Sequence, residues 1–535
     1  MRTLHHEPTT STIGAFAPTA SQSTTSEDPM RREAGIVEGF LGVVSSAPDR
    51  PAVRTLTHGA TYRDIERRAG GVAAALAALR PGPVVLLASN GPDLAAGALG
   101  ILAAGRTVVP TDPMIGARGL AERIEALDAA AILTSDQPTI DLPTAAVGTP
   151  PSTTFLALSD IPTTPLAVRP VGTPTQPSEP SIAVLGVTSG STGTPKRFGV
   201  GHGALLARIG RTDAGSQQPG EHFGMLLGAT QSAVKGVLTT LLLGGTVSCF
   251  DARSATMDDI AAGFATHRIT YLKLIPTFLR RVCQAVGPGQ LLPSLRLLAT
   301  GGEPLDWHDI AEIRRCLSSS CSVKQTYGAT ETGRIAARSI GPQEPVGTGT
   351  VPVGRPIPPA EVWIARPDGS PADPGEFGEI IVDAPTFRDG VVAEELPSGL
   401  GRYRTGDRGR FLPDGQLILA GRVDRRIKVG GLRIEPAQLE RILRELEGID
   451  EAVVLASPGQ GDGTTIVAHL AGRPPDGALE DTLRRHVAGS LHPAAVPSHL
   501  VWHPDGLPTL PSGKIDTAAL ATDPPARVPD SSGAD

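Results

Sequence analysis

The sequence predicts an α/β protein with three parts: a large N-terminal domain of parallel or mixed sheets covered by helices, a β-rich subdomain, and a small α+β C-terminal domain. Three observations predict this class. The chain has 535 residues, too many for one compact core. Helical patterns alternate with short apolar runs up to about residue 300, which is typical of a parallel sheet. The texture then changes at Val351 and again after Arg422.

The N-terminal part begins with residues 1–33, which are rich in Ser, Thr and Pro and are predicted to form a disordered tail. The domain itself is predicted over residues 34–421. Helical patterns occur at 70–80, 93–105 and 122–130, and apolar runs typical of buried strands occur at 83–89, 107–112, 131–135 and 181–187. Residues 141–180 are rich in Pro and Thr, so we expect them to be mostly loop.

The later part of the chain contains further αβ patterns at 236–250, 269–276 and 294–302. Short strands separated by turns follow from Val351 and predict the β-rich subdomain. A fresh α+β pattern over residues 422–520 predicts the small domain, and residues 521–535 are predicted to form a second disordered tail.

Composition excludes several classes of function. The formal charge of −7, from 48 basic and 55 acidic residues, argues against binding to nucleic acid or to an anionic membrane. Cys249, Cys283, Cys316 and Cys321 lack the spacing of a zinc site, so we expect reduced cysteines. Without an apolar run of membrane-spanning length or a secretory signal, a cytoplasmic location is expected.

The segment TSGSTGTPK, residues 188–196, follows the apolar run 181–187. Glycines let backbone N–H groups approach a polyphosphate, hydroxyl groups donate to its oxygens, and Lys196 adds positive charge. A Walker A loop ends in Gly-Lys-Ser/Thr, whereas Pro195 precedes Lys196 here. The alternative is a linker, but the strand before it and the Pro-Lys after it favour a phosphate-binding loop.

Other polar motifs follow in order. Gly301, Gly302 and Glu303 come directly after an apolar run, where open α/β sheets bind ligands. Tyr327 can stack on a base, Glu331 can hold Mg²⁺, and Asp407 can accept two ribose hydroxyls. Arg422, Asp424 and Lys514 complete the series. Singly, each has an ordinary alternative: a turn, a helix cap, a surface β-turn or a solvated lysine.

In their joint order these motifs resemble the acyl- and aminoacyl-adenylating superfamily, which includes adenylation domains of nonribosomal peptide synthetases, acyl-CoA synthetases and luciferases. The resemblance extends from about residue 36 to 520 and includes ATYRDIERRA and ILAAGRTVVPTD. It implies ATP and Mg²⁺ as cofactors, and a C-terminal domain that acts as a mobile lid over the larger body. We call residues 34–421 the core domain and residues 422–520 the lid domain.

The resemblance also implies a role for each motif residue. The β- and γ-phosphates would contact Thr188, Ser189, Gly190, Ser191, Thr192, Gly193 and Lys196. Gly301, Gly302, Glu303 and Tyr327 would surround the adenine, Thr330 would touch the α-phosphate, and Glu331 would bind Mg²⁺. Asp407 and Arg422 would hold the ribose, with Asp424 as the hinge of the lid domain. Lys514 would bridge the substrate carboxylate and the α-phosphate, where an ammonium offsets growing negative charge.

The acyl pocket departs from the peptide-synthetase pattern. Gln231 occupies the position of the Asp that pairs with a substrate ammonium, so an ordinary α-amino acid is not expected. The same gap-free alignment places these residues around the acid: Ser232, Lys235, Lys273, Leu298, Thr300, Thr326, Arg334 and Ile335. Three cations favour an acid with a second anionic group. The alternative is that the lysines point outward, or that a one-residue slip misplaces Lys235.

Two further departures concern entry to this pocket: Arg197 replaces the usual Gly, and Thr230 replaces a common aromatic residue. Three functional alternatives are open, and the first two differ in the final acceptor. The first is transfer to a carrier-protein thiol in trans, because no phosphopantetheine site follows Asp516. The second is a ligase that forms an acyl-CoA or an amide, and the third is a nucleotide-binding protein without catalysis.

Overall fold

The computed structural model describes most of the chain from Gly35 onward. The described residues are 35–135, 153–167, 182–188, 196–209, 217–226, 228, 230–251, 255–287, 292–329, 332–384, 394–396, 400–429, 432–458, 464–473, 477–510 and 514–522. The tail predicted at 1–33 lies outside these ranges. Of the tail predicted at 521–535, Ala521 and Thr522 instead end helix α13 (Thr517–Thr522), and the remainder also lies outside.

A six-stranded sheet has the strand order β6-β5-β3-β4-β7-β8. Its neighbouring strands are parallel except for the antiparallel pair β7 and β8. All four residues of β3 and of β4 are buried, as the continuous apolar runs predicted. The strands are β3 (Val84–Leu87), β4 (Val108–Thr111), β5 (Ala131–Thr134), β6 (Thr154–Ala157), β7 (Ile182–Thr188) and β8 (Lys196–Gly201).

A nine-stranded sheet has the order β15-β14-β13-β12-β11-β9-β10-β1-β2. Its centre, from β13 to β1, is parallel, and the pairs at both edges are antiparallel. The strands are β1 (Pro51–Arg54), β2 (Gly59–Thr61), β9 (His222–Met225), β10 (Thr246–Cys249), β11 (Tyr271–Leu274), β12 (Leu297–Gly301), β13 (Ser322–Ala329), β14 (Gly333–Ile340) and β15 (Arg355–Pro356).

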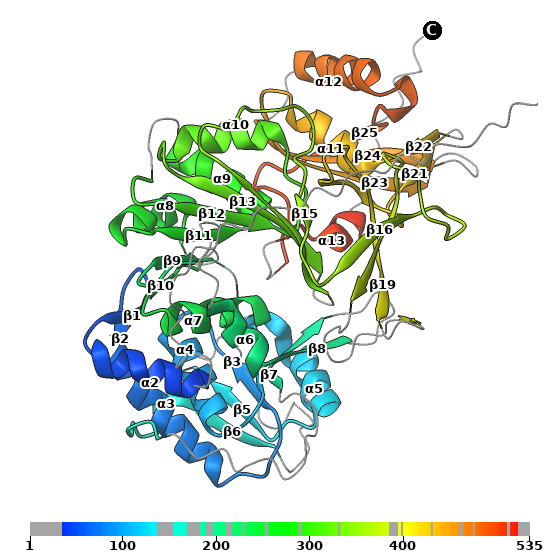
Figure 1. Cartoon of the computed structure of the whole chain (residues 1–535). Coiled ribbons are helices and arrows are strands. Elements are labelled where there is room, and N and C mark those ends of the chain that lie inside the picture. The colour runs from blue at the N-terminus through cyan, green and yellow to red at the C-terminus, as the bar shows by residue number, and fades with distance from the viewer. Residues whose placement is uncertain are drawn as a thin grey trace, which may run out of the picture. The chain divides into compact units, whose positions relative to one another are not determined.

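Helices fill the space between these sheets and cover their outer faces (Figure 1). One hydrophobic cluster joins α4 and α7 to β3 on one side and to β9 and β10 on the other, so these two helices lie between the sheets. A second cluster packs α5 on the far face of the six-stranded sheet, and a third packs α8, α9 and α10 on the far face of the nine-stranded sheet. The helices are α2 (Ile36–Ser46), α3 (Tyr62–Ala77), α4 (Pro92–Ala103), α5 (Gly116–Leu127), α6 (His202–Ile209), α7 (Gln231–Leu242), α8 (Met257–Thr266), α9 (Pro276–Val286) and α10 (Trp307–Cys316).

The β-rich subdomain is a five-stranded antiparallel sheet, in which β20 pairs with β19 beside the order β16-β17-β19-β18. Its strands are β16 (Glu361–Ala365), β17 (Gly378–Ala384), β18 (Glu394–Glu395), β19 (Gly401–Phe411) and β20 (Leu417–Arg422). The sheet begins ten residues after Val351, where the change of sequence texture predicted it.

The small C-terminal domain contains a three-stranded sheet, a β-hairpin and helices with a hydrophobic cluster of their own. Its elements are β21 (Ile427–Val429), β22 (Leu432–Ile434), α11 (Pro436–Arg444), β23 (Ile449–Pro458), β24 (Thr464–Gly472), α12 (Gly477–Ser490), β25 (His499–Trp502) and α13. The boundary predicted at residue 422 stays a prediction, and it falls between the end of β20 and the start of β21.

The predicted fold class is confirmed. Strand β6 lies inside the segment 141–180, which was predicted to be mostly loop, and it occupies only Thr154–Ala157 of the described residues 153–167. It has four residues and pairs in parallel with β5, and so short a run carries no periodic signal. The four cysteines are free in the structure. No helix among the described residues is long and apolar enough to cross a bilayer.

Candidate active site

The turn Gly301–Glu303 lies at the carboxyl end of β12, in the middle of the nine-stranded sheet. A Cβ atom on Gly301 would lie 2.3 Å from the backbone oxygen of Thr326, so only glycine lets β12 approach β13 this closely. Gly302 has a φ of 88°, in the left-handed region that favours glycine. Glu303 Oε2 accepts hydrogen bonds from the backbone nitrogen and the hydroxyl of Thr277, at 3.0 and 2.9 Å. The turn is therefore fixed to the first residues of α9.

Tyr327, on β13, is linked to Asp407, on β19 of the β-rich subdomain. The Tyr327 hydroxyl donates to Asp407 Oδ2 at 2.7 Å. Burial and the neighbouring carboxylate raise the pKa of Tyr327, so the phenol keeps its proton and its role as donor. Burial also raises the pKa of Asp407, and the hydrogen bond from Tyr327 and the charge of Arg422 oppose that rise. Asp407 Oδ1 stands 3.5 Å from Arg422 Nη1.

Arg422 connects this carboxylate to the junction with the lid domain. Its guanidinium donates to both carboxylate oxygens of Asp424, at 3.0 and 3.1 Å. These bonds hold the pKa of Asp424 below its ordinary value. The guanidinium also lies over Gly406, where a Cβ atom would come within 2.8 Å of Nη2. Four residues that the sequence singled out separately, Tyr327, Asp407, Arg422 and Asp424, thus form one connected chain.

Lys514, near the C-terminal end of the chain, lies beside the Gly301–Glu303 turn. Its carbonyl accepts from Leu510 N at 2.7 Å, and Asp516 N donates to Pro508 O at 2.8 Å, so Lys514 belongs to a narrow hairpin. Leu507 and Ile515 pack this hairpin on β23 and β24. A Cβ atom on Gly302 would lie 3.8 Å from Lys514 Nζ. The positive charge of Lys514 also acts on Asp407 and favours its ionised form.

The predicted phosphate loop lies mainly outside the described residues. Thr188 ends β7 and Lys196 begins β8, and the two are register partners in an antiparallel hairpin. The loop therefore connects two strands that are paired to their ends. Ser189, Gly190, Ser191, Thr192 and Gly193 lie outside the described residues, as do Thr330 and Glu331.

Helix α7 positions three of the predicted acyl-pocket residues. Gln231 Nε2 donates to Phe198 O at 2.7 Å and to Val184 O at 3.3 Å, so its amide ties α7 to β7 and β8. Lys273 Nζ, on β11, donates to Ser232 Oγ at 3.2 Å. Lys235, one helical turn further along α7, is only 8% exposed. The structure thus brings Ser232 and Lys273 into contact, with Lys235 on the neighbouring turn.

Register divides the remaining pocket residues between two sheet faces. Leu298 and Thr300 pair with Leu272 and Leu274, and Leu298 packs with both leucines in the cluster beneath α8–α10. Because successive side chains alternate, Lys273 lies on the opposite face, and the structure does not bring Leu298 and Thr300 to it. Thr300 is 1% exposed and its Oγ1 has no hydrogen-bond partner among the described atoms.

The last three predicted pocket residues lie on β13 and β14. Thr326 pairs with Gly301 and therefore shares the face of Lys273. Its hydroxyl donates to Thr300 O at 3.1 Å. Arg334 is exposed, and Ile335 packs with Tyr327 in the cluster that joins β14 to the β-rich subdomain.

The sequence reading missed Lys324. It pairs with Ala299, which pairs with Lys273, so both lysines lie on one face of the sheet two strands apart. Lys324 is 7% exposed. A lysine inside an otherwise buried strand, as in SVKQTYGA, was the available signal.

The two departures at the pocket entrance have structural roles. Thr230 caps α7, because its side chain accepts from Ala233 N at 3.2 Å. The exposed Arg197 side chain donates to the carbonyl of Ala126, at the end of α5. A threonine in place of an aromatic residue thus begins the helix that holds Gln231, Ser232 and Lys235.

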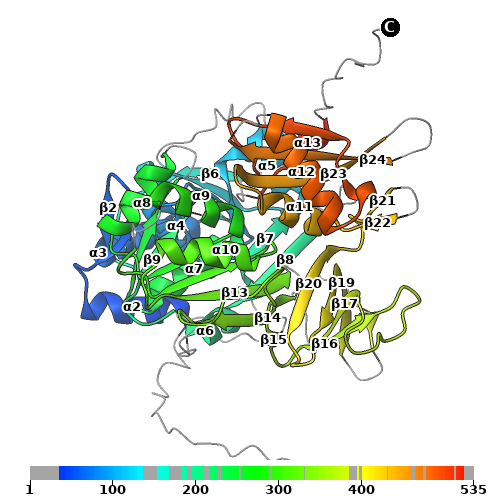
Figure 2. The ribbon, with the colours of Figure 1, turned by 90° about the horizontal axis from the view of Figure 1, so that it is seen from above.

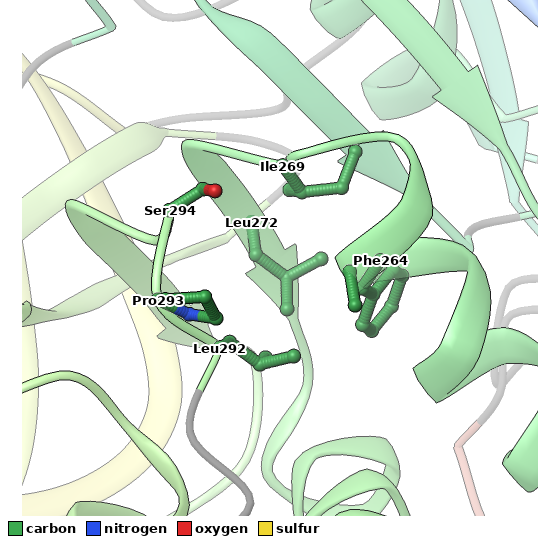
Figure 3. A pocket seen from close by; sticks show the side chains of 7 residues that line it. Phe264, Ile269, Leu272, Leu292, Pro293 and Ser294 are labelled. Carbon is green, nitrogen blue, oxygen red and sulfur yellow. The ribbon is translucent and has the colours of Figure 1, made fainter.

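A separate pocket lies on the other face of the nine-stranded sheet from Lys273 (Figure 3). It is lined by Phe264, Ala265, Ile269, Leu272, Leu292, Pro293 and Ser294. Leu272 belongs to the sheet face opposite Lys273, and the lining contains no charged side chain. An acid or a phosphate would find no counter-charge there, so this pocket is not a candidate for the site.

Two family models match the chain. The model described as AMP-binding enzyme matches residues 42–391, and the model described as AMP-binding enzyme C-terminal domain matches residues 438–514. Phenyloxazoline synthase MbtB of Mycobacterium sp. (strain MCS) is 32% identical over 524 residues, which cover 92% of this chain and 42% of that protein. The chain thus spans less than half the length of this relative.

Two other similarities concern smaller proteins. An L-proline–[L-prolyl-carrier protein] ligase of Pseudomonas fluorescens is 32% identical over 64% of this chain and 68% of its own. The solved structure of the amide bond synthetase McbA from Marinactinospora thermotolerans superposes with a TM-score of 0.71 and 26% identity, covering 91% of this chain and 99% of that one.

Proposed function

The chain belongs to the AMP-binding enzyme family, and from this premise we propose that it joins a carboxylic acid to the AMP part of ATP and releases pyrophosphate. The observation that carries the proposal is the position of Lys514 over Gly302, with Asp407 within reach of its charge. The ammonium of Lys514, the carboxylate of Asp407 and the turn at Gly302 come from three separate parts of the chain and lie close together.

The proposed reaction is a single displacement at the α-phosphorus of ATP. A carboxylate oxygen of the acid forms a bond to this phosphorus, the bond to the oxygen that bridges to the β-phosphate breaks, and pyrophosphate leaves with that electron pair. Carboxylate and triphosphate repel each other, so a fixed ammonium at Lys514 lowers the cost of bringing them together. Ionised Asp407 has two oxygens that can accept the ribose hydroxyls.

For the residues proposed to bind the phosphates and the metal ion, the support comes from the sequence alone. Mg²⁺ would supply further positive charge to the phosphates, with Glu331 as its proposed ligand. Glu331 and most of the loop between β7 and β8 lie outside the described residues. Among the proposed site residues, the structure therefore describes Lys514, the carboxylate of Asp407 proposed to bind the ribose, and the glycine turn.

For the acid, we propose a substrate with a second anionic group, such as another carboxylate or a phosphonate. Three observations support it: the 8% exposure of Lys235, the hydrogen bond from Lys273 to Ser232, and the placement of Lys324 on the same sheet face as Lys273. The amide of Gln231 donates to two backbone carbonyls, so it offers no negative charge to a substrate ammonium. An ordinary α-amino acid would lack its usual counter-ion.

For the acceptor, we propose the thiol of a carrier protein acting in trans. The similarity to a prolyl-carrier protein ligase, over 68% of that protein, supports this choice. Formation of an amide is the second candidate, because the similarity to an amide bond synthetase covers 99% of that chain. Incubating the adenylate with carrier proteins, coenzyme A and amines, and weighing the products, separates the alternatives.

The test of the first half-reaction is exchange of labelled pyrophosphate into ATP with a panel of monocarboxylic, dicarboxylic, phosphono and amino acids. We expect exchange with an acid that carries a second anion. Lys514→Ala should slow exchange by roughly 10²–10³-fold, the scale of one preorganised electrostatic contact. Exchange with no acid, together with an unchanged Lys514→Ala protein, would refute the proposed function. Exchange with plain α-amino acids alone would refute the proposed substrate class.

A further inference from the structure

Two ion pairs join the lid domain to the core domain away from the junction, where the pairs Arg408–Glu435 and Asp407–Arg422 also cross between the domains. Arg281 on α9 donates from Nε and Nη2 to the two carboxylate oxygens of Glu451 on β23, at 2.9 and 3.1 Å. Arg444, the last residue of α11, donates to Asp306 Oδ2 at 2.8 Å. The partners are 170 and 138 residues apart in the sequence. Glu451 and Asp306 are only 6% and 5% exposed at their side chains, so both pairs are largely shielded from water.

Apolar packing, by contrast, stays within each domain. The hydrophobic clusters of the lid domain contain residues from Ile427 onward, and those of the core domain contain none of them, among the residues that the structure describes. Charged partners regain hydration when they separate, whereas separated apolar surfaces do not. A contact made of ion pairs is therefore suited to a domain that associates reversibly with the core domain.

The core-domain partners of both pairs stand beside the Gly301–Glu303 turn. Arg281 lies one helical turn after Thr277, whose backbone and hydroxyl hold Glu303. Asp306 is the N-cap of α10 and follows Glu303 by three residues. Arg280 donates to Asp309, whose carboxylate accepts from Asp306 N at 2.9 Å, so the position of Asp306 is itself fixed. In both Figure 1 and Figure 2, α11 lies next to α10.

The lid-domain partners are tied to the hairpin of Lys514. Glu451 and Val453 lie two residues apart on β23 and so share a sheet face. Val453 packs with Leu507 and Ile515, which hold the hairpin. Arg281 is also near the chain that leads into it, since a Cβ atom on Gly506 would lie 3.6 Å from Arg281 Nη2. Arg281 is thus connected to the Gly301–Glu303 turn, and Glu451 to the hairpin that carries Lys514.

We propose that Arg281 and Arg444 are positioning residues, which dock the lid domain through Glu451 and Asp306 and so place Lys514 over Gly302. The inference rests on the proposed function, because it assigns these residues to the adenylation step. They touch neither reacting group. Their effect is to fix how often Lys514 occupies the position seen here, so they act on the turnover number of adenylation and leave the KM for ATP nearly unchanged.

The test uses charge reversal and its rescue in the full-length protein. Arg281→Glu and Glu451→Arg each place like charges together, and we expect each to lower kcat for pyrophosphate exchange about 10- to 100-fold. The double variant restores opposite charges and should recover most of the loss. Arg444→Gln should also lower kcat, and it spares the N-cap of α10. Arg485→Glu is the matched control, since Arg485 is exposed on α12 and, among the described residues, its side chain donates to Asp481 and Thr482 of its own helix.

A second readout does not depend on activity. Hydrogen exchange of peptides over residues 301–306, measured with Mg-ATP, should speed up in Arg281→Glu and return towards the original rate in the double variant. Melting temperature should change little, since each domain keeps its own core. Unchanged kcat and unchanged hydrogen exchange in Arg281→Glu would overturn the inference, as would a double variant no better than either single one. If the native protein exchanges no pyrophosphate, the proposed function fails, and hydrogen exchange alone then decides whether the pairs dock the lid domain.

Discussion

Asp407 illustrates how burial and two neighbours set the state of one carboxylate. Burial raises its pKa, while Tyr327 donates a hydrogen bond and Arg422 supplies charge that both favour the ionised form. With Asp407 as the proposed acceptor of the ribose hydroxyls, we expect binding of ATP to weaken as the pH falls through this pKa. Because the pKa is raised, that loss begins at a higher pH than it would for an exposed aspartate.

The first prediction follows from the 2.7 Å bond between Tyr327 and Asp407. Tyr327→Phe removes a hydrogen bond that favours the carboxylate, so the pKa of Asp407 should rise further. The acid limb of the pH profile of kcat/KM for ATP should then move to higher pH, with the plateau at high pH less affected. Tyr271→Phe, on β11 and outside this chain of contacts, should leave the limb in place. A limb that stays or moves to lower pH would contradict the assignment.

The second prediction concerns Gln231, whose side chain holds α7 to β7 and β8. Gln231→Glu keeps the shape but turns the donor into a carboxylate oxygen that faces two backbone carbonyls. We expect the free energy of unfolding to fall by about 1–3 kcal/mol, the cost of leaving such groups unsatisfied. Urea unfolding measures it. Gln438→Glu, exposed on α11, is the control and should change stability by less than about 0.5 kcal/mol.

At the scale of the element, β12 and its turn are the most constrained part of the site. Gly301→Ala would set a Cβ atom 2.3 Å from the Thr326 backbone, which cannot move without parting β12 from β13. At Gly302 the nearest atoms to a Cβ are the flexible end of Lys514, at 3.7 and 3.8 Å, and the cost is the φ of 88°. The third prediction is that Gly301→Ala lowers the free energy of unfolding by more than about 2 kcal/mol, and Gly302→Ala by about 1 kcal/mol.

Activity separates the two glycines further. Gly302→Ala adds a methyl group beneath the Lys514 ammonium, so we expect pyrophosphate exchange to slow more than the small change in stability explains. Chemical unfolding and exchange, measured on the same preparations, test both parts. Equal losses of stability in the two variants would show that the approach of β12 to β13 is looser than the structure has it.

Helices and strands were predictable from the sequence where the pattern of apolar residues was clear. The buried runs of β3 and β4 and the helices α4 and α11 follow directly from apolar periodicity. Register was not predictable. The alignment grouped Lys273 with Leu298 and Thr300, but the pairing of β11 with β12 places these side chains on opposite faces. A shift of one residue along a strand moves a side chain to the other face of the sheet, and the sequence of one strand alone does not fix its register against its partner.

At the scale of the whole molecule, the candidate site residues were easier to find in the sequence than the residues that form ion pairs between the two domains. Tyr327, Asp407, Arg422 and Lys514 were each visible in a motif, and the structure brings them near one turn. The pairs of Arg281 and Arg444 with their carboxylates left no local signal, since each arginine lies on an ordinary amphipathic helix and its partner is more than a hundred residues away. Lys324 was overlooked for a related reason, because its neighbours come from other strands.

The two domains are connected by the short exposed segment between β20 and β21, in which Asp424 is the proposed hinge. Val423 N donates to Gly406 O at 2.8 Å, which ties the segment to the core domain up to that residue. The proposed rotation of the lid domain would therefore come from backbone angles beyond Val423. Proline fixes φ near −65° and restricts the residue before it, so Asp424→Pro should hinder such rotation.

The fourth prediction is that Asp424→Pro separates the two half-reactions. In the proposed reaction the adenylate forms with Lys514 at Gly302, the arrangement that the structure has, so pyrophosphate exchange should fall by no more than about fivefold, the scale of roughly 1 kcal/mol of local strain. Transfer to the acceptor should fall far more if it requires a second position of the lid domain. Single-turnover transfer from preformed adenylate measures this step. Asp424→Ala removes the pair with Arg422 but leaves φ free, and so it should slow neither step as Pro does. Equal loss of both half-reactions in Asp424→Pro would mean that the segment serves only as a tether, with no rotation between the steps.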